Sequence, residues 1–245
     1  MKAQSSKDDR SNGQLPSDSD EQQGVGRKQF LKVLSSGLLA PFLSLRLQGR
    51  ADAAQSCTVP EPGPGQVSMR TLSDSELAVA VYPTFSYNSV GGGGLATARE
   101  EGSIVHMTFD PSTLSIPDVN YRNTTFMGVP MAPPFSIAVK PKKLEGYVDR
   151  STGKAELTFL ADFMFTAGPL YSAPPLVVTT NLTTESVQGR TQGGQGSRMD
   201  ENGYTKLVGI AQLEPTKDAL LDRFLMLPND CKALMSAQFN FGAAA

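Results

Sequence analysis

The longest regular alternation of apolar and polar side chains lies near the middle of the chain, between residues 135 and 167. Its apolar positions are Leu157, Phe159, Ala161, Phe163 and Phe165, and its polar positions are Glu156, Thr158 and Asp162. Because side chains alternate between the two faces of a strand, this pattern predicts a half-buried antiparallel strand. The run 144–148 precedes it, joined by Asp149–Gly153, where Asp can cap a turn and Gly can adopt a positive φ. We therefore predict a long central hairpin.

Shorter patterns predict further strands on both sides of this hairpin and one helix near the C-terminus. The predicted strands are Glu76–Tyr87, Ser103–Asp110, Leu176–Thr184, Lys206–Leu213 and Ala233–Phe241, and the predicted helix is Lys217–Leu227. The segments 58–65, 91–94 and 187–203 are expected to be a proline-rich leader, a flexible hairpin loop and an exposed polar loop. The fold class predicted is therefore all-β and mainly antiparallel, a β-sandwich or flattened barrel with one short C-terminal helix.

Composition supports this class and argues against nucleic-acid binding. The chain has 23 Gly and 17 Pro residues, which is typical of many turns between short strands. Its net charge is −2 and its Lys and Arg residues are scattered, so no basic stripe is available to contact phosphates.

The N-terminal region has the composition of a targeting sequence and not of a folded domain. Residues 1–24 carry almost no apolar side chains, so they are expected to be a disordered polar leader. Residues 25–53 then combine basic Arg27 and Lys28, an apolar run over 33–45, and small residues ending in Ala51 and Ala53. These are the parts of a cleavable export signal, and the run is too short to span a bilayer. Cleavage after Ala53 would leave residues 54–245 as a single β domain.

The details of this signal resemble a known export family. Arg27, Lys28, Phe30 and Leu31, followed by a lysine, match the twin-arginine pattern with Lys28 in place of the second arginine. A polar leader ahead of such a signal is similar to the bipartite presequence of nucleus-encoded thylakoid-lumen proteins. The resemblance implies the chloroplast thylakoid lumen as the location, with the bacterial periplasm as the alternative.

Two cysteines, Cys57 and Cys231, lie near the two ends of the predicted domain. An even number of cysteines in an exported protein favours a disulfide, whereas the alternative is two separate buried thiols. A zinc site is not expected, because the cysteines are not clustered with other ligands.

The usual parts of an active site are missing from the sequence. His106 is the only histidine, it lies on the polar side of a predicted strand, and no G-x-S-x-G motif accompanies it. The carboxylate pairs Asp149 with Glu156 and Asp162 with Glu185 are interpreted as turn and solvent-facing residues. We therefore expect no enzymatic activity and no cofactor.

The remaining candidate for function is the loop Tyr121–Pro134, which is unusually apolar. Its candidate contact residues are Tyr121, Phe126, Met127 and Met131. Such side chains either cover the end of a sheet or form a contact patch. Our hypothesis is an accessory or assembly protein that binds a protein partner, such as a photosystem or another thylakoid membrane complex, and is peripheral rather than integral at the membrane. The alternatives are a carrier of a small lipophilic ligand in a β-barrel and a bacterial periplasmic binding or structural protein.

Overall fold

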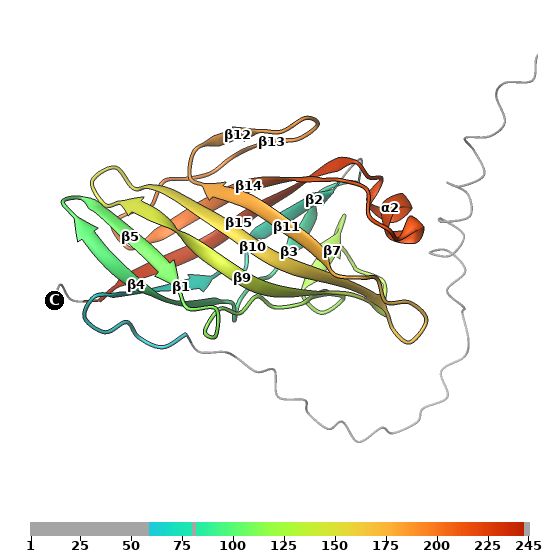
Figure 1. Ribbon diagram of the computed structural model, residues 1–245, viewed down its shortest axis with the longest axis horizontal. Coiled ribbons are helices and arrows are strands. Elements are labelled where there is room, and N and C mark those ends of the chain that lie inside the picture. Colours follow the sequence, from blue (N-terminus) through green and yellow to red (C-terminus); the bar gives the residue numbers. More distant parts are fainter. Residues whose placement is uncertain (1–58, 80–81, 243–245) are drawn as a thin grey trace, which may run out of the picture. The chain divides into compact units, whose positions relative to one another are not determined.

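The central hairpin is the longest strand pair of the molecule, and the sheet extends from it in both directions (Figure 1). The computed structural model describes residues 59–79 and 82–242. Strand β9 (Phe135–Asp149) pairs with β10 (Lys154–Ala167) along its whole length. In the turn between them, the Asp149 carboxylate accepts hydrogen bonds from Ser151 and Thr152, and Gly153 has φ 71°. The predicted hairpin and its turn chemistry are therefore present.

The sheet closes on itself as an antiparallel barrel. The strands follow one another around it in the order β1 (Gln66–Thr71), β4 (Gly93–Glu101), β5 (Ile104–Phe109), β9, β10, β11 (Leu176–Thr183), β14 (Tyr204–Leu213) and β15 (Asn229–Phe241). Pairing of β1 with β15, with Met69 opposite Phe239, completes the ring. The predicted all-β antiparallel class is confirmed, in the form of a barrel.

Smaller strands pair, directly or through one another, with the parts of β9 and β15 that are not paired with the barrel strands β5 and β1. These are β2 (Ser75–Val79), β3 (Phe85–Tyr87), β6 (Val119–Asn120), β7 (Thr124–Phe126) and β8 (Val129–Pro130). The residues 231–234 of β15 pair with β2, which leads on to β3, β7 and β8, while β6 pairs with the start of β9. A separate ribbon of β12 (Ser186–Gln188) and β13 (Gly193–Gln195) lies beside β14.

The two ends of the barrel differ in what they carry. One end holds the β7–β8 hairpin, the loop 168–175 and the helix α2 (Ala219–Leu225), and we call it the helix end. The other end holds the tight turns after β4 and β9 and the start of β14, and we call it the hairpin end. Figure 1 shows the two ends at opposite limits of the long axis of the barrel.

Alternating side chains fill the barrel with two apolar clusters. The first consists of Val67, Met69, Ala96, Val105, Met107, Phe109, Val139, Leu144, Val148, Ala155, Leu157, Phe159, Ala161, Leu182, Leu207, Ala237 and Phe239. The second, toward the helix end, consists of Phe165, Ala173, Leu176, Val178, Ala211, Leu213, Leu221 and Leu225. Phe163 packs against both clusters, so the inward face of β10 connects them.

Several strand boundaries differ from the sequence predictions. Glu76–Tyr87 is two strands rather than one, and the residues 66–71, which no pattern indicated, form β1. β9 is continuous through Pro141, because a bulge opposite Leu160 and Ala161 absorbs the irregularity. The polar loop 187–203 contains parts of β12 and all of β13.

The prediction of a flexible glycine loop at 91–94 is wrong. Gly93 and Gly94 begin β4 and pair with β1, and Gly93 also exchanges two backbone hydrogen bonds with Ser115. At Gly93 φ is 135°, and a Cβ there would lie 1.9 Å from the carbonyl oxygen of Met69. The glycine is needed because two backbones approach it closely.

The helix α2 is shorter than predicted and is capped at both ends. The Asp218 carboxylate accepts the backbone N–H groups of Leu220 and Leu221, and these bonds, chiefly that of Leu221, lower its pKa. Met226 ends the helix in the left-handed conformation, with φ 55°. Leu221 and Leu225 are buried, so the helix is fixed to the barrel by one face.

Replacing Asp230 by asparagine is expected to lower the free energy of unfolding by about 2 kcal/mol at neutral pH. Asp230 is fully buried and its Oδ2 accepts the N–H of Thr191 at 2.7 Å. Burial raises the pKa of this carboxyl, but the N–H groups of Thr191, Gln192 and Arg190 outweigh that effect, so the pKa is lowered from 3.8.

The lowered pKa of Asp230 also predicts how the stability difference between wild type and the Asp230→Asn variant changes at acidic pH. A carboxylate with a lowered folded-state pKa stabilises fully above its unfolded value and loses that contribution as the pH falls through the folded value. The difference between wild type and variant in urea unfolding should therefore narrow below pH 3.8. If the difference in unfolding free energy stayed constant below pH 3.8, the charge of Asp230 would not be what stabilises the β12–β13 ribbon.

Candidate functional site

The loop Tyr121–Pro134, called the docking loop below, is folded as a hairpin. β7 and β8 pair through Phe126 and Val129, and the turn between them consists of Met127 and Gly128. Their φ angles are 51° and 80°, the pattern of a type I′ turn, which normally selects Asn and Gly. A methionine at this left-handed position is uncommon and strained, so its presence calls for a reason outside the turn itself.

The four predicted contact residues divide into two exposed and two half-buried side chains. Met127 is 76% exposed and Tyr121 is 44% exposed. Phe126 lies against Phe85 of β3, with ring centroids 5.0 Å apart, and Met131 is half-buried. Part of the loop therefore covers the sheet, and part of it faces outward.

Hydrogen bonds order the docking loop internally and attach it to the segment that follows β3. Asn88 donates its backbone N–H to the carbonyl of Asn123 at 2.8 Å, and Met131 donates to the carbonyl of Thr124 at 2.9 Å. The guanidinium of Arg122 lies 5.5 Å from the ring centroid of Tyr121 and donates to its hydroxyl at 3.1 Å. The exposed side chains are thus presented by an ordered scaffold.

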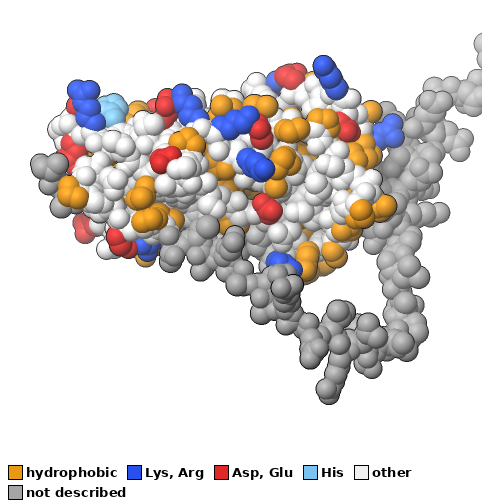
Figure 2. Space-filling view, turned by 60° about the horizontal axis from the view of Figure 1, so that its bottom comes forward, with side chains coloured by type: hydrophobic (Ala, Val, Ile, Leu, Met, Phe, Trp, Pro, Cys, Tyr) orange, Lys and Arg blue, Asp and Glu red, His pale blue; other side chains and the backbone are white. Residues whose placement is uncertain are grey.

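Neighbouring segments of the helix end add further exposed apolar side chains. They are Leu170, Leu220 and Met226, and Val129 of the docking loop itself is also exposed. Figure 2 shows hydrophobic side chains at several places on this face of the molecule, among them the end opposite the histidine. Contacts between the segments place them at one end: the Tyr171 hydroxyl donates to Asp218 at 3.0 Å, and the Tyr82 hydroxyl donates to the carbonyl of Phe224 at 3.1 Å.

The distribution of charged residues along the sequence also indicates this surface. The chain has no charged residue in three long stretches, 77–98, 123–139 and 163–184. In the structure these stretches contact one another: Phe85 of the first lies 5.0 Å from Phe126 of the second between ring centroids, and Phe135 of the second pairs with Ala167 of the third. Uncharged stretches far apart in sequence are therefore a better indicator of the site than any one of its residues.

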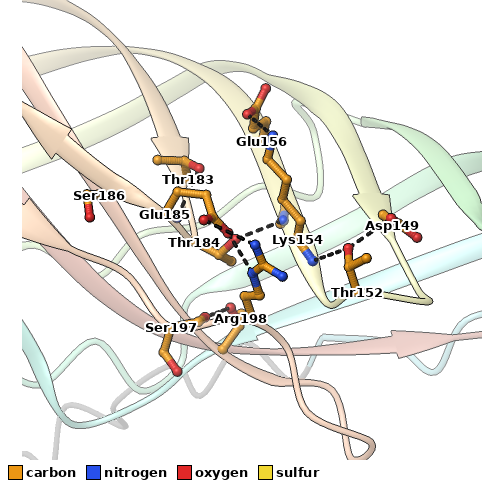
Figure 3. Close-up of polar contacts among 12 residues, drawn as sticks. Asp149, Thr152, Lys154, Glu156, Thr183, Thr184, Glu185, Ser186, Ser197 and Arg198 are labelled. Atoms are coloured by element: carbon orange, nitrogen blue, oxygen red, sulfur yellow. Dashed lines mark hydrogen bonds and ion pairs between the residues drawn. The ribbon is translucent and has the colours of Figure 1, made fainter.

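The hairpin end has the opposite character, because charged side chains pair there with their neighbours (Figure 3). Glu156 lies 2.8 Å from the ammonium of Lys154, whose hydrogen bond lowers the pKa of Glu156. Arg198 donates to both oxygens of Glu185, at 2.8 and 3.3 Å, and lowers its pKa in the same way. These are ion pairs of a solvated surface, which contribute little to the stability of the fold.

The structure does not bring the sequence-derived carboxylate pairs together as a catalytic dyad. The Asp149 carboxylate accepts hydrogen bonds within its own turn. Glu156 and Glu185 each pair with a basic side chain, and the Asp162 carboxylate lies 2.7 Å from the Lys142 ammonium. His106 is half exposed on β5, with Nε2 3.7 Å from a Glu101 oxygen. Among the described residues, no group of three or more His, Cys, Asp or Glu side chains is placed to hold a metal ion.

Of the remaining predicted residues, all but Cys231 lie outside the described part of the chain. This is so for the targeting residues Arg27, Lys28, Phe30, Leu31, Ala51 and Ala53, and for Cys57. Cys231 is half-buried in β15, and burial raises the pKa of its thiol to about 12. The Cys57–Cys231 disulfide stays a prediction.

No helix within residues 59–79 and 82–242 is long and apolar enough to cross a bilayer. No protein-family model, curated protein or solved structure matches this chain.

Proposed function

We propose that this chain is a non-catalytic accessory or assembly protein of the thylakoid lumen, which binds a photosynthetic membrane complex through the docking loop. The observation that carries the proposal is the exposed Met127 at the tip of an ordered hairpin, in a backbone conformation that its side chain disfavours. Evolution of the turn for stability alone would favour Asn there. A contact residue explains why methionine occupies the position, since its flexible thioether adapts to a partner surface.

The rest of the loop supports a protein–protein contact. Tyr121 is a large amphipathic side chain already ordered by Arg122, so it loses little conformational entropy on binding. Aromatic and methionine side chains are enriched at the centres of interfaces. The location follows from the resemblance of residues 25–53 to a lumen-targeting signal.

A pull-down from detergent-solubilised thylakoid membranes tests this proposal. The tagged protein is expected to enrich the subunits of one membrane complex, identified by mass spectrometry, over beads that carry an unrelated lumenal protein. Enrichment of no membrane subunit over those beads would refute the proposal.

A carrier of a small lipophilic molecule is the second candidate, favoured by the closure of the barrel. Inward aromatic side chains converge beneath α2, where Phe224 lies 5.0 Å from Phe135 and 6.5 Å from Phe165 between ring centroids. Barrels of this size hold either a packed core or one small ligand. Native mass spectrometry distinguishes the two candidates, because a carrier isolated from its source retains a ligand of discrete mass.

A further inference from the structure

We propose that Met127 and Met226 are sites of reversible oxidation to methionine sulfoxide, and that a sulfoxide at Met127 releases the partner. The inference rests on the proposed function, because it assigns a form of regulation to the docking loop. Met127 lies at the tip of the β7–β8 hairpin and Met226 is the C-cap of α2, so the two belong to separate segments of the helix end. Their side chains are 76% and 47% exposed.

The backbone conformation at these two positions indicates that the side chain is the reason for the residue. Within residues 59–79 and 82–242, Met127 and Met226 are the only residues other than glycine with a positive φ, at 51° and 55°. The left-handed conformation favours Gly or Asn, both in a type I′ turn and at the end of a helix. The chain therefore accepts backbone strain twice, and both times the residue is an exposed methionine.

The other methionines in the described part of the chain are less exposed. Two are buried and four are half-buried: Met69 and Met107, and Met131, Met164, Met199 and Met235. An oxidant must reach the sulfur, so exposed methionines react first. Cys231 does not compete for peroxide, because the thiolate is the reactive form and burial raises the pKa of this thiol to about 12. Among the described residues, the most accessible oxidation sites therefore lie at the helix end.

The oxidation is a two-electron step in which the oxidant is hydrogen peroxide. The thioether sulfur attacks one peroxide oxygen, so that an S–O bond forms while the O–O bond breaks. The proton of the transferred oxygen passes to the departing hydroxide, which leaves as water. Methionine sulfoxide reductases reverse the step with a dithiol, which becomes a disulfide while the oxygen leaves as water.

Sulfoxide formation replaces a flexible apolar side chain by a polar and chiral one. A partner surface that packs on the Met127 thioether would have to desolvate the S=O group without a hydrogen-bond donor placed to receive it. Oxidation of this residue therefore weakens the contact. Because the side chain is exposed, the barrel itself is expected to stay folded.

Peptide mapping by mass spectrometry tests the site assignment without a partner. The full-length protein is treated with hydrogen peroxide for increasing times, and sulfoxide is quantified at each methionine. Met127 and Met226 are expected to oxidise several-fold faster than Met131 and Met235. Equal rates at these four positions would overturn the proposal.

The pull-down then tests the consequence for binding. Tagged wild type, Met127→Leu and Met226→Leu are oxidised, freed of peroxide and only then mixed with solubilised membranes. Each recovery is compared with that of the same protein left untreated. Oxidation is expected to lower recovery roughly tenfold with wild type and with Met226→Leu, but not with Met127→Leu, which cannot form a sulfoxide at that position. Treatment with methionine sulfoxide reductase should restore the recovery.

The regulatory proposal and the proposed function fail in different ways. Recovery of no membrane subunit with untreated wild type refutes the proposed function, whereas recovery that oxidation does not reduce overturns the regulation. An equal loss with wild type and with Met127→Leu would also overturn it, because another group would then be the one oxidised. So would a large fall in the melting temperature of the oxidised wild type, since release would then reflect unfolding.

Discussion

Replacing Gly93 by alanine is expected to lower the free energy of unfolding by about 3 kcal/mol or more, a large fraction of the 5 to 15 kcal/mol typical of a domain. The added Cβ would lie 1.9 Å from the carbonyl oxygen of Met69, an atom of the pairing between β1 and β4. Backbone cannot move aside there without opening the barrel, since Gly93 also bonds to Ser115 on its other side. Urea unfolding followed by circular dichroism measures the loss.

Gly91 provides the matched control. It also has a positive φ, 96°, but a Cβ there meets nothing within 4 Å. Gly91→Ala should therefore cost only the backbone strain, on the order of 1 kcal/mol. Equal costs at Gly91 and Gly93 would show that the close approach to Met69 does not limit the position.

The double replacement Tyr121→Ser with Met127→Asn is expected to weaken association with the partner complex roughly 30- to 100-fold, or about 2 to 3 kcal/mol. Both side chains are exposed, so their loss removes partner contacts without opening the core. Asparagine at position 127 followed by Gly128 is the preferred pair for a type I′ turn. The melting temperature should therefore stay the same or rise slightly, while binding falls.

Replacing Phe126 is expected to have the opposite effect on the melting temperature, and this variant serves as the internal comparison. Because its ring packs on Phe85, Phe126→Ser should lower the melting temperature clearly. If the Tyr121 and Met127 replacements also lowered it by several degrees, these side chains would be part of a core lid and not of a contact surface.

The sequence predicted the fold best where one face of a strand is buried and the other is solvated. In β10, Leu157, Phe159 and Ala161 are buried while Glu156 and Thr158 are not, so period-2 alternation is visible. In β1 the neighbours Val67, Ser68 and Met69 are all buried, which removes the alternation and conceals the strand. The glycines 93 and 94 have no side chains to show a period, so only the tertiary approach of β1 identifies them as strand residues.

The same limit applies to the candidate site. The apolar composition of residues 121–134 indicated a special loop, but not which of its side chains face outward. That division depends on Phe85, which lies about forty residues earlier and pairs with Phe126 through β3 and β7. The helix end as a surface depends on contacts between Phe135 and Phe224, and no local pattern contains such a contact.

The central claim is that function lies in the helix end and not in the charged hairpin end. Its most direct test is the pull-down performed side by side with wild type, with the Tyr121→Ser/Met127→Asn variant, and with an Ile104→Ser/Tyr204→Ser variant. The last removes two exposed apolar side chains from the opposite end of the barrel. We predict that the membrane complex is recovered with wild type and with the hairpin-end variant, and is lost with the docking-loop variant. Recovery with the docking-loop variant and loss with the hairpin-end variant would contradict the account and place the binding surface at the opposite end.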